Sequence, residues 1–284
     1  MTVDVLAEES RIRLACFLTV LLAMNAWEFL APRRKWMVRK PPRLISNYVL
    51  AIFNTFAIRA LLPVSAVSAS LWAERHGWGL LHLAEWPSGV EIVLTVLLLD
   101  AAIYGQHVLF HCVPLFWRIH KVHHADPDLD VSSGLRFHTI EILLSMLIKI
   151  GLILILGLAA WGVIAFEVIL NATSMFNHSN ARMPLGLDRL LRLIVVTPDM
   201  HRVHHSVIRK ETDSNFGFNL PWWDRLFGTY RDQPEAGHEK MTIGLPEYRD
   251  EKVSTRLIAM LAIPFQSNPQ TSDPPEPEAE SREG

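Results

Sequence analysis

Residues 90–124 of this chain read VEIVLTVLLLDAAIYGQHVLFHCVPLFWRIHKVHH. An apolar run long enough to cross a membrane ends in His107 and His111, which share one helix face because they are four residues apart. Three more histidines follow in the pattern H-x-x-H-H at 120–124, and positions i, i+3 and i+4 of a helix also face one way. The two adjacent histidines point about 100° apart, so one helix can offer ligands to two metal ions. The stretch therefore predicts a helical membrane protein with a metal site at the end of a span.

The H-x-x-H-H pattern occurs a second time at 201–205, and another histidine stands in the segment NHSN at 177–180. Nine of the thirteen histidines lie in these motifs, each of which is beside an apolar run. Neutral imidazole is a good ligand for iron, zinc, copper and nickel. The predicted metal ligands are His107, His111, His120, His123, His124, His178, His201, His204 and His205.

Two polar residues near the motifs have roles that the pattern leaves open. His138 is a further ligand, a donor that orients a ligand, or an interfacial residue anchored by Glu141. Either Thr197 or Asp199 is expected to cap the helix that displays the last histidine cluster, with a proline at its first position. If Asp199 is not the cap, it is a candidate carboxylate for orienting an imidazole.

Asp100 lies inside the span 90–113, where a carboxylate is costly and usually functional. It is expected either to orient a ligand imidazole or to form a structural ion pair with Arg59 or Lys149. Cys112 is a candidate ligand or, more simply, a small buried residue. The carboxylates of the loop 126–130 are expected either to orient ligands or to be solvated.

Four apolar runs predict four or five membrane helices, at 12–31, 44–72, 90–113 and 140–176. The last run is about twice the length of one span, and Gly157 and Gly162 offer a hairpin near its middle. The first run is too long for a cleavable signal peptide, and acidic residues rather than a basic n-region precede it. The fold class is therefore an all-α integral membrane protein with a histidine-rich helical cap.

A dense basic cluster at 33–43 separates the first two runs, and the positive-inside rule places it in the cytoplasm. Counting the spans from there brings all four histidine motifs to the same cytoplasmic side. We expect the inner membrane of a bacterium rather than the endoplasmic reticulum. Trp222, Trp223 and Phe227 are expected either to line a substrate entry at the bilayer interface or to act as aromatic anchors.

Several other classes of protein are disfavoured. The formal net charge is only −2 and no basic stripe is present, which argues against nucleic acid as a partner. The two cysteines provide neither a disulfide framework nor a C-x-x-C motif. The motifs of zinc peptidases, α/β-hydrolases and nucleotide-binding loops are missing from the sequence.

The order H-x-x-x-H, H-x-x-H-H and a later H-x-x-H-H between membrane spans resembles the fatty acid hydroxylase/sterol desaturase superfamily. The segments TPDMHRVHHS at 197–206, DSNFG at 213–217 and WDRLFGTY at 223–230 are especially similar to bacterial members. The similarity covers residues 90–232, about half of the chain. Some fatty acid 2-hydroxylases have a further histidine where this chain has Ser174, which leaves one metal a ligand short or His138 in its place.

The resemblance implies an integral-membrane diiron oxygenase that hydroxylates or desaturates a lipid with dioxygen and two electrons. It assigns ligand roles to the nine histidines above. No heme-binding cytochrome b5 domain is recognised in the sequence, so electrons are expected from NAD(P)H through a separate carrier of the ferredoxin or cytochrome b5 type. Sterols, fatty acyl chains and other isoprenoid or alkyl lipids all remain candidate substrates.

The resulting division of the chain has four parts. An N-terminal transmembrane region covers 1–89, the diiron domain covers 90–232, a cytoplasmic segment covers 233–264, and a disordered tail covers 265–284. Two rival functions use the same ligands: a dizinc membrane hydrolase, and a metal-binding or transport protein without catalysis. A hydrolase would need neither dioxygen nor reductant, so oxygen consumption separates it from an oxygenase.

Overall fold

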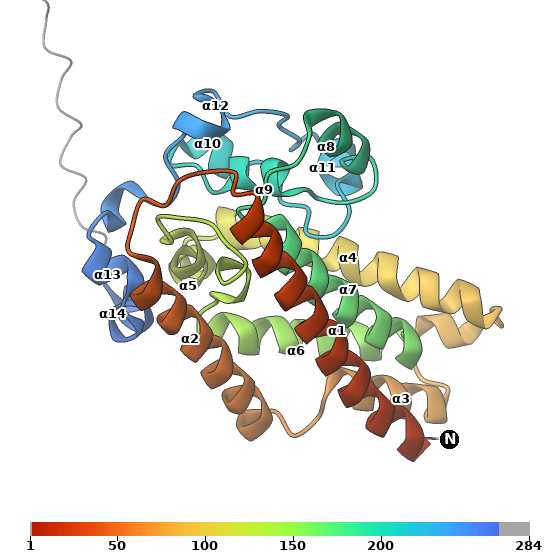
Figure 1. Ribbon diagram of the computed structural model, residues 1–284. Coiled ribbons are helices and arrows are strands. Elements are labelled where there is room, and N and C mark those ends of the chain that lie inside the picture. Colours follow the sequence, from red (N-terminus) through yellow and green to blue (C-terminus); the bar gives the residue numbers. More distant parts are fainter. Residues whose placement is uncertain (1, 267–284) are drawn as a thin grey trace, which may run out of the picture.

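The structure, a computed structural model, describes residues 2–266, which form helices and connecting loops and contain no β-strand (Figure 1). The longer helices are α1 (Thr2–Leu30), α2 (Lys40–Leu61), α3 (Ala66–His76), α4 (Ser88–Cys112), α5 (Pro114–His124), α6 (Thr139–Leu156) and α7 (Ala160–Asn177). The shorter ones are α8 (Leu185–Leu191), α9 (Pro198–His204), α10 (Arg209–Thr212), α11 (Trp222–Phe227), α12 (Gly237–Lys240), α13 (Glu251–Thr255) and α14 (Leu257–Ala262). Single 3₁₀ turns lie at Leu80–Leu83, Ser133–Leu135, Pro246–Tyr248 and Ile263–Phe265. From residue 267 the predicted tail lies outside the described residues.

Four segments are long and apolar enough to cross a membrane: Glu8–Leu30, Lys40–Leu83, Ser88–Cys112 and Thr139–Leu156. The all-helical membrane fold is thereby confirmed, and the four candidate spans, which do not include α7, agree with the lower of the two predicted numbers. Large apolar side chains on α1 and α2 point outward, including Leu22, Phe29 and Phe56, which are 69 %, 84 % and 67 % exposed. An apolar surface of this kind is stable against lipid chains and not against water.

The run 44–72, predicted as one span, is two helices. α2 ends at Leu61, and the side chain of Ser65 then caps α3 by accepting a hydrogen bond of 3.1 Å from the backbone N–H of Ser68. Pro63 lies between them, and proline disfavours a helical conformation in the residue before it. α3 turns away from α2 and packs against α6 and α7.

The hairpin predicted in the last apolar run forms at Gly157, between α6 and α7. Gly157 has φ +70°, and a Cβ on the neighbouring Gly79 would lie 2.2 Å from the Gly157 nitrogen, so both positions require glycine. Gly162, the other candidate for this turn, lies inside α7. A Cβ there would lie 2.5 Å from Cβ of Thr95, so Gly162 lets α7 pack closely on α4.

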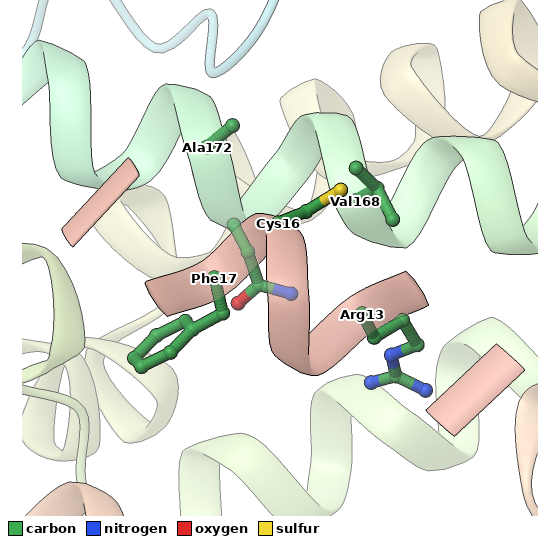
Figure 2. A pocket seen from close by; sticks show the side chains of 6 residues that line it. Arg13, Cys16, Phe17, Val168 and Ala172 are labelled. Atoms are coloured by element: carbon green, nitrogen blue, oxygen red, sulfur yellow. The ribbon is translucent and has the colours of Figure 1, made fainter. Parts of the chain in front are cut away.

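α7 is the central helix of the bundle, because it packs along α1, α3 and α4. A small pocket between α1 and α7 is shown in Figure 2, and it is lined by Arg13, Cys16, Phe17, Val168, Asn171 and Ala172. Nearby, Glu167 binds both Arg13 and Lys149, at 2.8 Å each, so these charges inside the bundle are paired. No histidine lines this pocket, which is therefore separate from the metal-binding motifs.

The short helices α8 to α12 and their loops, residues 178–249, form a cap at one end of the bundle (Figure 1). The basic loop 31–39 lies against this cap. The backbone N–H of Arg33 donates to the carbonyl of Asn180 at 2.7 Å, and the Arg34 guanidinium donates to the carbonyls of His238 and Met241 at 2.5 and 2.7 Å. The basic loop and the histidine motifs are thus at the same end of the helices.

Candidate metal centre

Four helices bring the nine predicted ligands together. α4 ends with His107 and His111 on one face, and α5, which starts at a proline, carries His120, His123 and His124 near its C-terminal end. His178 is the residue that ends α7. The remaining three lie on or directly after α9, which Thr197 caps by accepting a hydrogen bond from Met200 N–H at 3.3 Å. All nine side chains are buried, with at most 6 % exposed.

The nine rings form two groups, which we call group A and group B. Group A consists of His107, His111, His120, His124 and His204, and group B of His123, His178, His201 and His205. Within each group, one ring nitrogen from every residue lies within 4.8 Å of the others. Both H-x-x-H-H motifs are divided between the groups, since adjacent residues of a helix point about 100° apart.

Distances between ring nitrogens within the groups match those expected around a bound ion. In group B, Nε2 of His178 lies 3.1 Å from Nε2 of His123 and 3.0 Å from Nε2 of His201. In group A, Nε2 of His111 and Nε2 of His124 are 3.1 Å apart. Ligands at about 2.0–2.1 Å from one metal ion are separated from each other by about 3.0–3.4 Å. The two sets of nitrogens therefore fit one ion each.

Backbone carbonyls orient several of the rings by accepting hydrogen bonds from Nδ1. His107 and His204 donate to the carbonyls of Phe216 and Ser214 at 2.8 and 2.7 Å. His178 donates to a carbonyl one turn earlier on its own helix at 2.8 Å. Because a carbonyl can only accept, the proton sits on Nδ1 and the lone pair of Nε2 is directed into the group.

Two carboxylates orient rings in group A. Oε1 of Glu141 accepts from Nδ1 of His120 at 2.7 Å, and Oδ1 of Asp213 lies 3.2 Å from Nδ1 of His111. Glu141 is buried in the first turn of α6, whereas the Asp213 side chain is 35 % exposed. The sequence predicts Glu141 only as a partner of His138. A carboxylate at the start of an apolar helix is nevertheless a signal that it orients a metal ligand. In group B, Nδ1 of His123 and Nδ1 of His178 each have a backbone carbonyl as their partner.

Burial keeps the rings in the state that binds metals. Removal from water lowers the pKa of His204 to about 3 and that of His178 to about 4, and it also lowers the pKa of His124 and His201. These four rings are therefore neutral at pH 7. Nε2 of His107, His120 and His204 has no hydrogen-bond partner among the described residues. A buried unpaired polar atom costs about 1–3 kcal/mol, so the donor set fits bound metal ions.

His138 lies outside both groups. Its Nδ1 accepts from Ile140 N–H at 3.2 Å and thereby caps α6, and its Nε2 lies 3.3 Å from the carbonyl of Leu261. Both ring nitrogens are occupied by backbone groups, which corrects the prediction that His138 replaces a missing ligand. Ser174, at the position of the family's extra histidine, donates through Oγ to the carbonyl of Gly134 at 2.7 Å.

The predicted roles of Asp100 and Asp199 are also corrected. Asp100 accepts from the indole N–H of Trp223 at 2.8 Å and from Leu220 N–H at 3.3 Å, and these partners include neither an imidazole nor a basic side chain. Asp199 binds Arg202 and, at 3.2 Å, Arg33. Arg202 is three residues away on the same helix, whereas Trp223, Leu220 and Arg33 come from distant segments that the local pattern does not place next to Asp100 or Asp199.

Two further expectations differ from the structure. Cys112 is exposed on the surface of the bundle and belongs to neither group. The acidic loop 126–130 is neither solvated nor in contact with imidazoles, because buried Arg43 binds Asp126 at 2.5 Å and Asp130 at 2.7 Å. Asp128 accepts from two backbone N–H groups of the basic loop.

Comparison with known proteins agrees with this geometry. The family model for fatty acid hydroxylase matches residues 92–229, which include all nine histidines of groups A and B. An ornithine lipid hydroxylase of Rhizobium tropici is 30 % identical over 64 % of this chain and 52 % of its own length. Human alkylglycerol monooxygenase is 32 % identical over 51 % of this chain and 31 % of its own.

Rat cholesterol 25-hydroxylase is 26 % identical over 51 % of this chain and 48 % of its own length. The chain thus spans about half or less of the length of these curated relatives. No solved structure matches. The matched region contains both histidine groups and the segments that orient them, so this part of the chain is similar to the fatty acid hydroxylase family.

Proposed function

We propose that this protein is a membrane-bound oxygenase that hydroxylates or desaturates a lipid, using two iron ions, dioxygen and electrons from another protein. The observation that carries the proposal is the pair of buried groups A and B, nine histidines at the cap end of membrane helices. The relatives, which are named as hydroxylases and monooxygenases of lipids, support the same reaction class.

Hydroxylation converts a C–H bond, dioxygen, two electrons and two protons into an alcohol and water. When bound, iron supplies the activation of dioxygen that this reaction requires. Groups A and B would hold the ions, and Glu141 would keep His120 in a productive orientation. The ring of Phe137 stacks on His123 with centroids 4.4 Å apart and helps to keep water away from group B.

Iron is favoured over zinc by the chemistry of the relatives rather than by the ligands. Imidazole binds both metals well, so the histidines alone fit a dizinc hydrolase equally. Zinc has no redox chemistry, however, and the names of the relatives describe oxidations. These names also favour oxygen insertion over desaturation for the present chain.

The substrate class we infer is a membrane lipid. The relatives act, by name, on an ornithine lipid, alkylglycerols and cholesterol, which share a polar group attached to a long apolar body. The position of groups A and B at the end of apolar helices suits such a molecule, since its body can stay in the bilayer during reaction.

We further infer that groups A and B face the cytoplasm, in the inner membrane of a bacterium. The basic loop 31–39 lies at the same end as the cap, and loops rich in lysine and arginine remain in the cytoplasm. Electrons from NAD(P)H would then arrive through a soluble carrier of the ferredoxin or cytochrome b5 type, which can dock at this face.

The experiment that tests the proposal is expression of the chain in a bacterial host under ¹⁸O₂, followed by comparative lipidomics. A host that carries His204→Ala provides the matched control, because that protein lacks one ring of group A. We expect lipids that gain one ¹⁸O atom only with the unchanged protein. Products that take oxygen from water, and that form without dioxygen or reductant, would replace the oxygenase with a hydrolase.

A further inference from the structure

Two short helices of the cap, α8 and α11, expose large apolar side chains although they are not membrane spans. Leu185 and Leu190 on α8, and Ile194 just after it, are 59 %, 62 % and 59 % exposed. Leu226 and Phe227 on α11 are 68 % and 63 % exposed. We call residues 185–194 and 222–227 together the apolar arm. A soluble surface rarely carries so many exposed large apolar groups side by side, so a partner is expected.

The two helices of the apolar arm form one unit. The indole N–H of Trp222 donates to the carbonyl of Leu193 at 2.6 Å, and the Arg225 guanidinium donates to the carbonyl of Arg192 at 3.2 Å. Arg192 directly follows α8, is buried, and binds Asp188 of the same helix at 2.7 Å, which stabilises the end of α8. The exposed apolar side chains therefore belong to a single, internally braced surface.

The apolar arm is fastened to the side of α4, not to its end. The indole N–H of Trp223 donates to Asp100 at 2.8 Å, and the ring of Phe227 stacks on Tyr104 with centroids 5.4 Å apart. The Tyr104 hydroxyl also lies 3.0 Å from Oγ1 of Thr229, just after α11. These contacts explain the carboxylate inside the span, because Asp100 accepts a hydrogen bond from Trp223 of the arm.

The position of Asp100 gives the depth of this attachment. α4 contains 25 residues from Ser88 to Cys112, so Asp100 is its middle residue. At about 1.5 Å per residue it lies about 18 Å from either end, and half of a hydrocarbon core is about 15 Å thick. In Figure 1, α8 and α11 accordingly lie over the middle of α4 and not beyond its end. A span that crosses the bilayer carries the arm into the membrane with it.

We propose that the apolar arm is inserted among the acyl chains of the leaflet on the cap side, so that its partner is membrane lipid. On the α4 face that carries Asp100, Val93 lies about two turns earlier and is 57 % exposed, so α4 presents apolar surface on this side as well. Arg189 is exposed on α8, and an arginine can keep its alkyl stem in apolar surroundings while its guanidinium points towards the polar interface. The interaction rests on the membrane position of α4 and not on the chemistry of groups A and B.

Insertion would also connect the leaflet to the candidate metal centre. The segment that leads into α11 contains the carbonyls of Ser214 and Phe216, which orient His204 and His107 of group A. Lipid that holds the arm on α4 therefore also holds these two carbonyls in place. The apolar arm is a membrane-anchored support for one wall of group A.

The test measures the depth of a spin label on the arm in lipid nanodiscs. Leu226→Cys is labelled in a background with Cys16→Ser and Cys112→Ser. Relaxation by dioxygen, which concentrates in hydrocarbon, is compared with relaxation by a water-soluble nickel chelate. Phe56→Cys on α2 is the lipid-facing control, and Lys240→Cys, exposed at the end of α12, is the aqueous control.

We expect the label at 226 to behave like the label at 56, accessible to dioxygen and protected from nickel. A second label at Leu190→Cys on α8 is expected to give the same result, since the two helices form one surface. Access to nickel equal to that of the Lys240 control would overturn the proposal. Protection from both reagents together with spin–spin broadening would overturn it as well, because a second copy of the chain would then cover the arm. Neither measurement requires metal or substrate, so failure here is distinct from failure of the proposed function.

Discussion

Glu141 acts on group A through His120, and its contribution is the negative charge next to Nδ1. Glu141→Gln keeps an oxygen acceptor of the same size but removes the charge that increases the basicity of the imidazole. Loss of such a partner typically weakens metal binding by about 10- to 100-fold. We therefore expect a fall in iron affinity of that order, measured by competition with a chelator on the purified protein.

Asp213→Asn is the matched comparison for this prediction. The Asp213 side chain is 35 % exposed and is shared with Arg209, which binds its other oxygen at 2.5 Å. Its charge is therefore more strongly screened, and we expect a smaller loss of affinity than for Glu141→Gln. Equal affinities in the unchanged protein and in Glu141→Gln would show that the carboxylate does not tune the site.

His204→Ala is expected to abolish product formation while the protein remains inserted and folded. His204 belongs to group A, and its loss removes one of five rings around that ion. His76→Ala, in the last turn of α3, is the control: that ring is exposed and lies outside both groups. A surface substitution of this kind changes stability within about 0.5 kcal/mol. Wild-type iron content and activity in His204→Ala would mean that group A is misassigned.

At this scale the nine histidines could be predicted from the sequence, because helical spacing decides which residues share a face. Their orienting partners could not, since these come from distant segments. Glu141 and Phe216 approach His120 and His107 only when α6 and the loop before α11 are packed. Asp100 shows the reverse case: the sequence predicts that it orients an imidazole or pairs with a basic residue, and it instead accepts a hydrogen bond from Trp223 of α11.

At the scale of elements, the start of α2 is joined to the loop after α5 by a buried arginine. Burial raises the pKa of Asp126, but the positive charges of Arg43 and Arg136 outweigh this and hold that pKa below its usual value. Arg43 also binds Asp130 and donates to Oγ of Ser133 at 2.8 Å. This ion-pair network keeps the loop that follows the first H-x-x-H-H next to the basic loop.

Arg43→Met removes the charge and leaves two buried carboxylates without their main partner. Breaking a buried ion pair from one side typically costs about 3–5 kcal/mol, so we expect a clear loss of thermal stability and of folded protein in membranes. Size-exclusion chromatography after heating measures this in detergent. Arg39→Met is the control, since that side chain is 85 % exposed and its ion pair with Glu251 has a longer N–O distance of 3.8 Å. Equal melting temperatures for the two variants would contradict the structural role of Arg43.

The elements themselves were predictable to different degrees. Apolar length was sufficient to place α1, α4, α6 and α7, and the turn at Gly157 follows from its left-handed backbone. Apolar length was misleading at 44–72, where Pro63 divides the run. The attachment of α11 to the middle of α4 had no local signal, because it depends on how the cap folds back on the bundle.

At the scale of the whole molecule, the cap and the basic loop must face the same compartment. Lys35 and Lys240 are both exposed at the cap end, whereas Glu85 is exposed before the start of α4, at the opposite end. Single cysteines at 35 and 240 are expected to react with an impermeant reagent only from the cytoplasmic side. A cysteine at 85 is expected to react only from outside. Labelling of 35 and 240 from opposite faces would separate the basic loop from groups A and B.

The central claim is that groups A and B hold two iron ions in one chain. The most direct measurement is elemental analysis of the protein purified from cells grown with iron, combined with a Mössbauer spectrum of ⁵⁷Fe-enriched material. Because group A has five rings and group B has four, we predict close to two irons per chain in two distinct environments. Zinc alone in the purified protein, with activity that persists after iron is removed, would contradict the account.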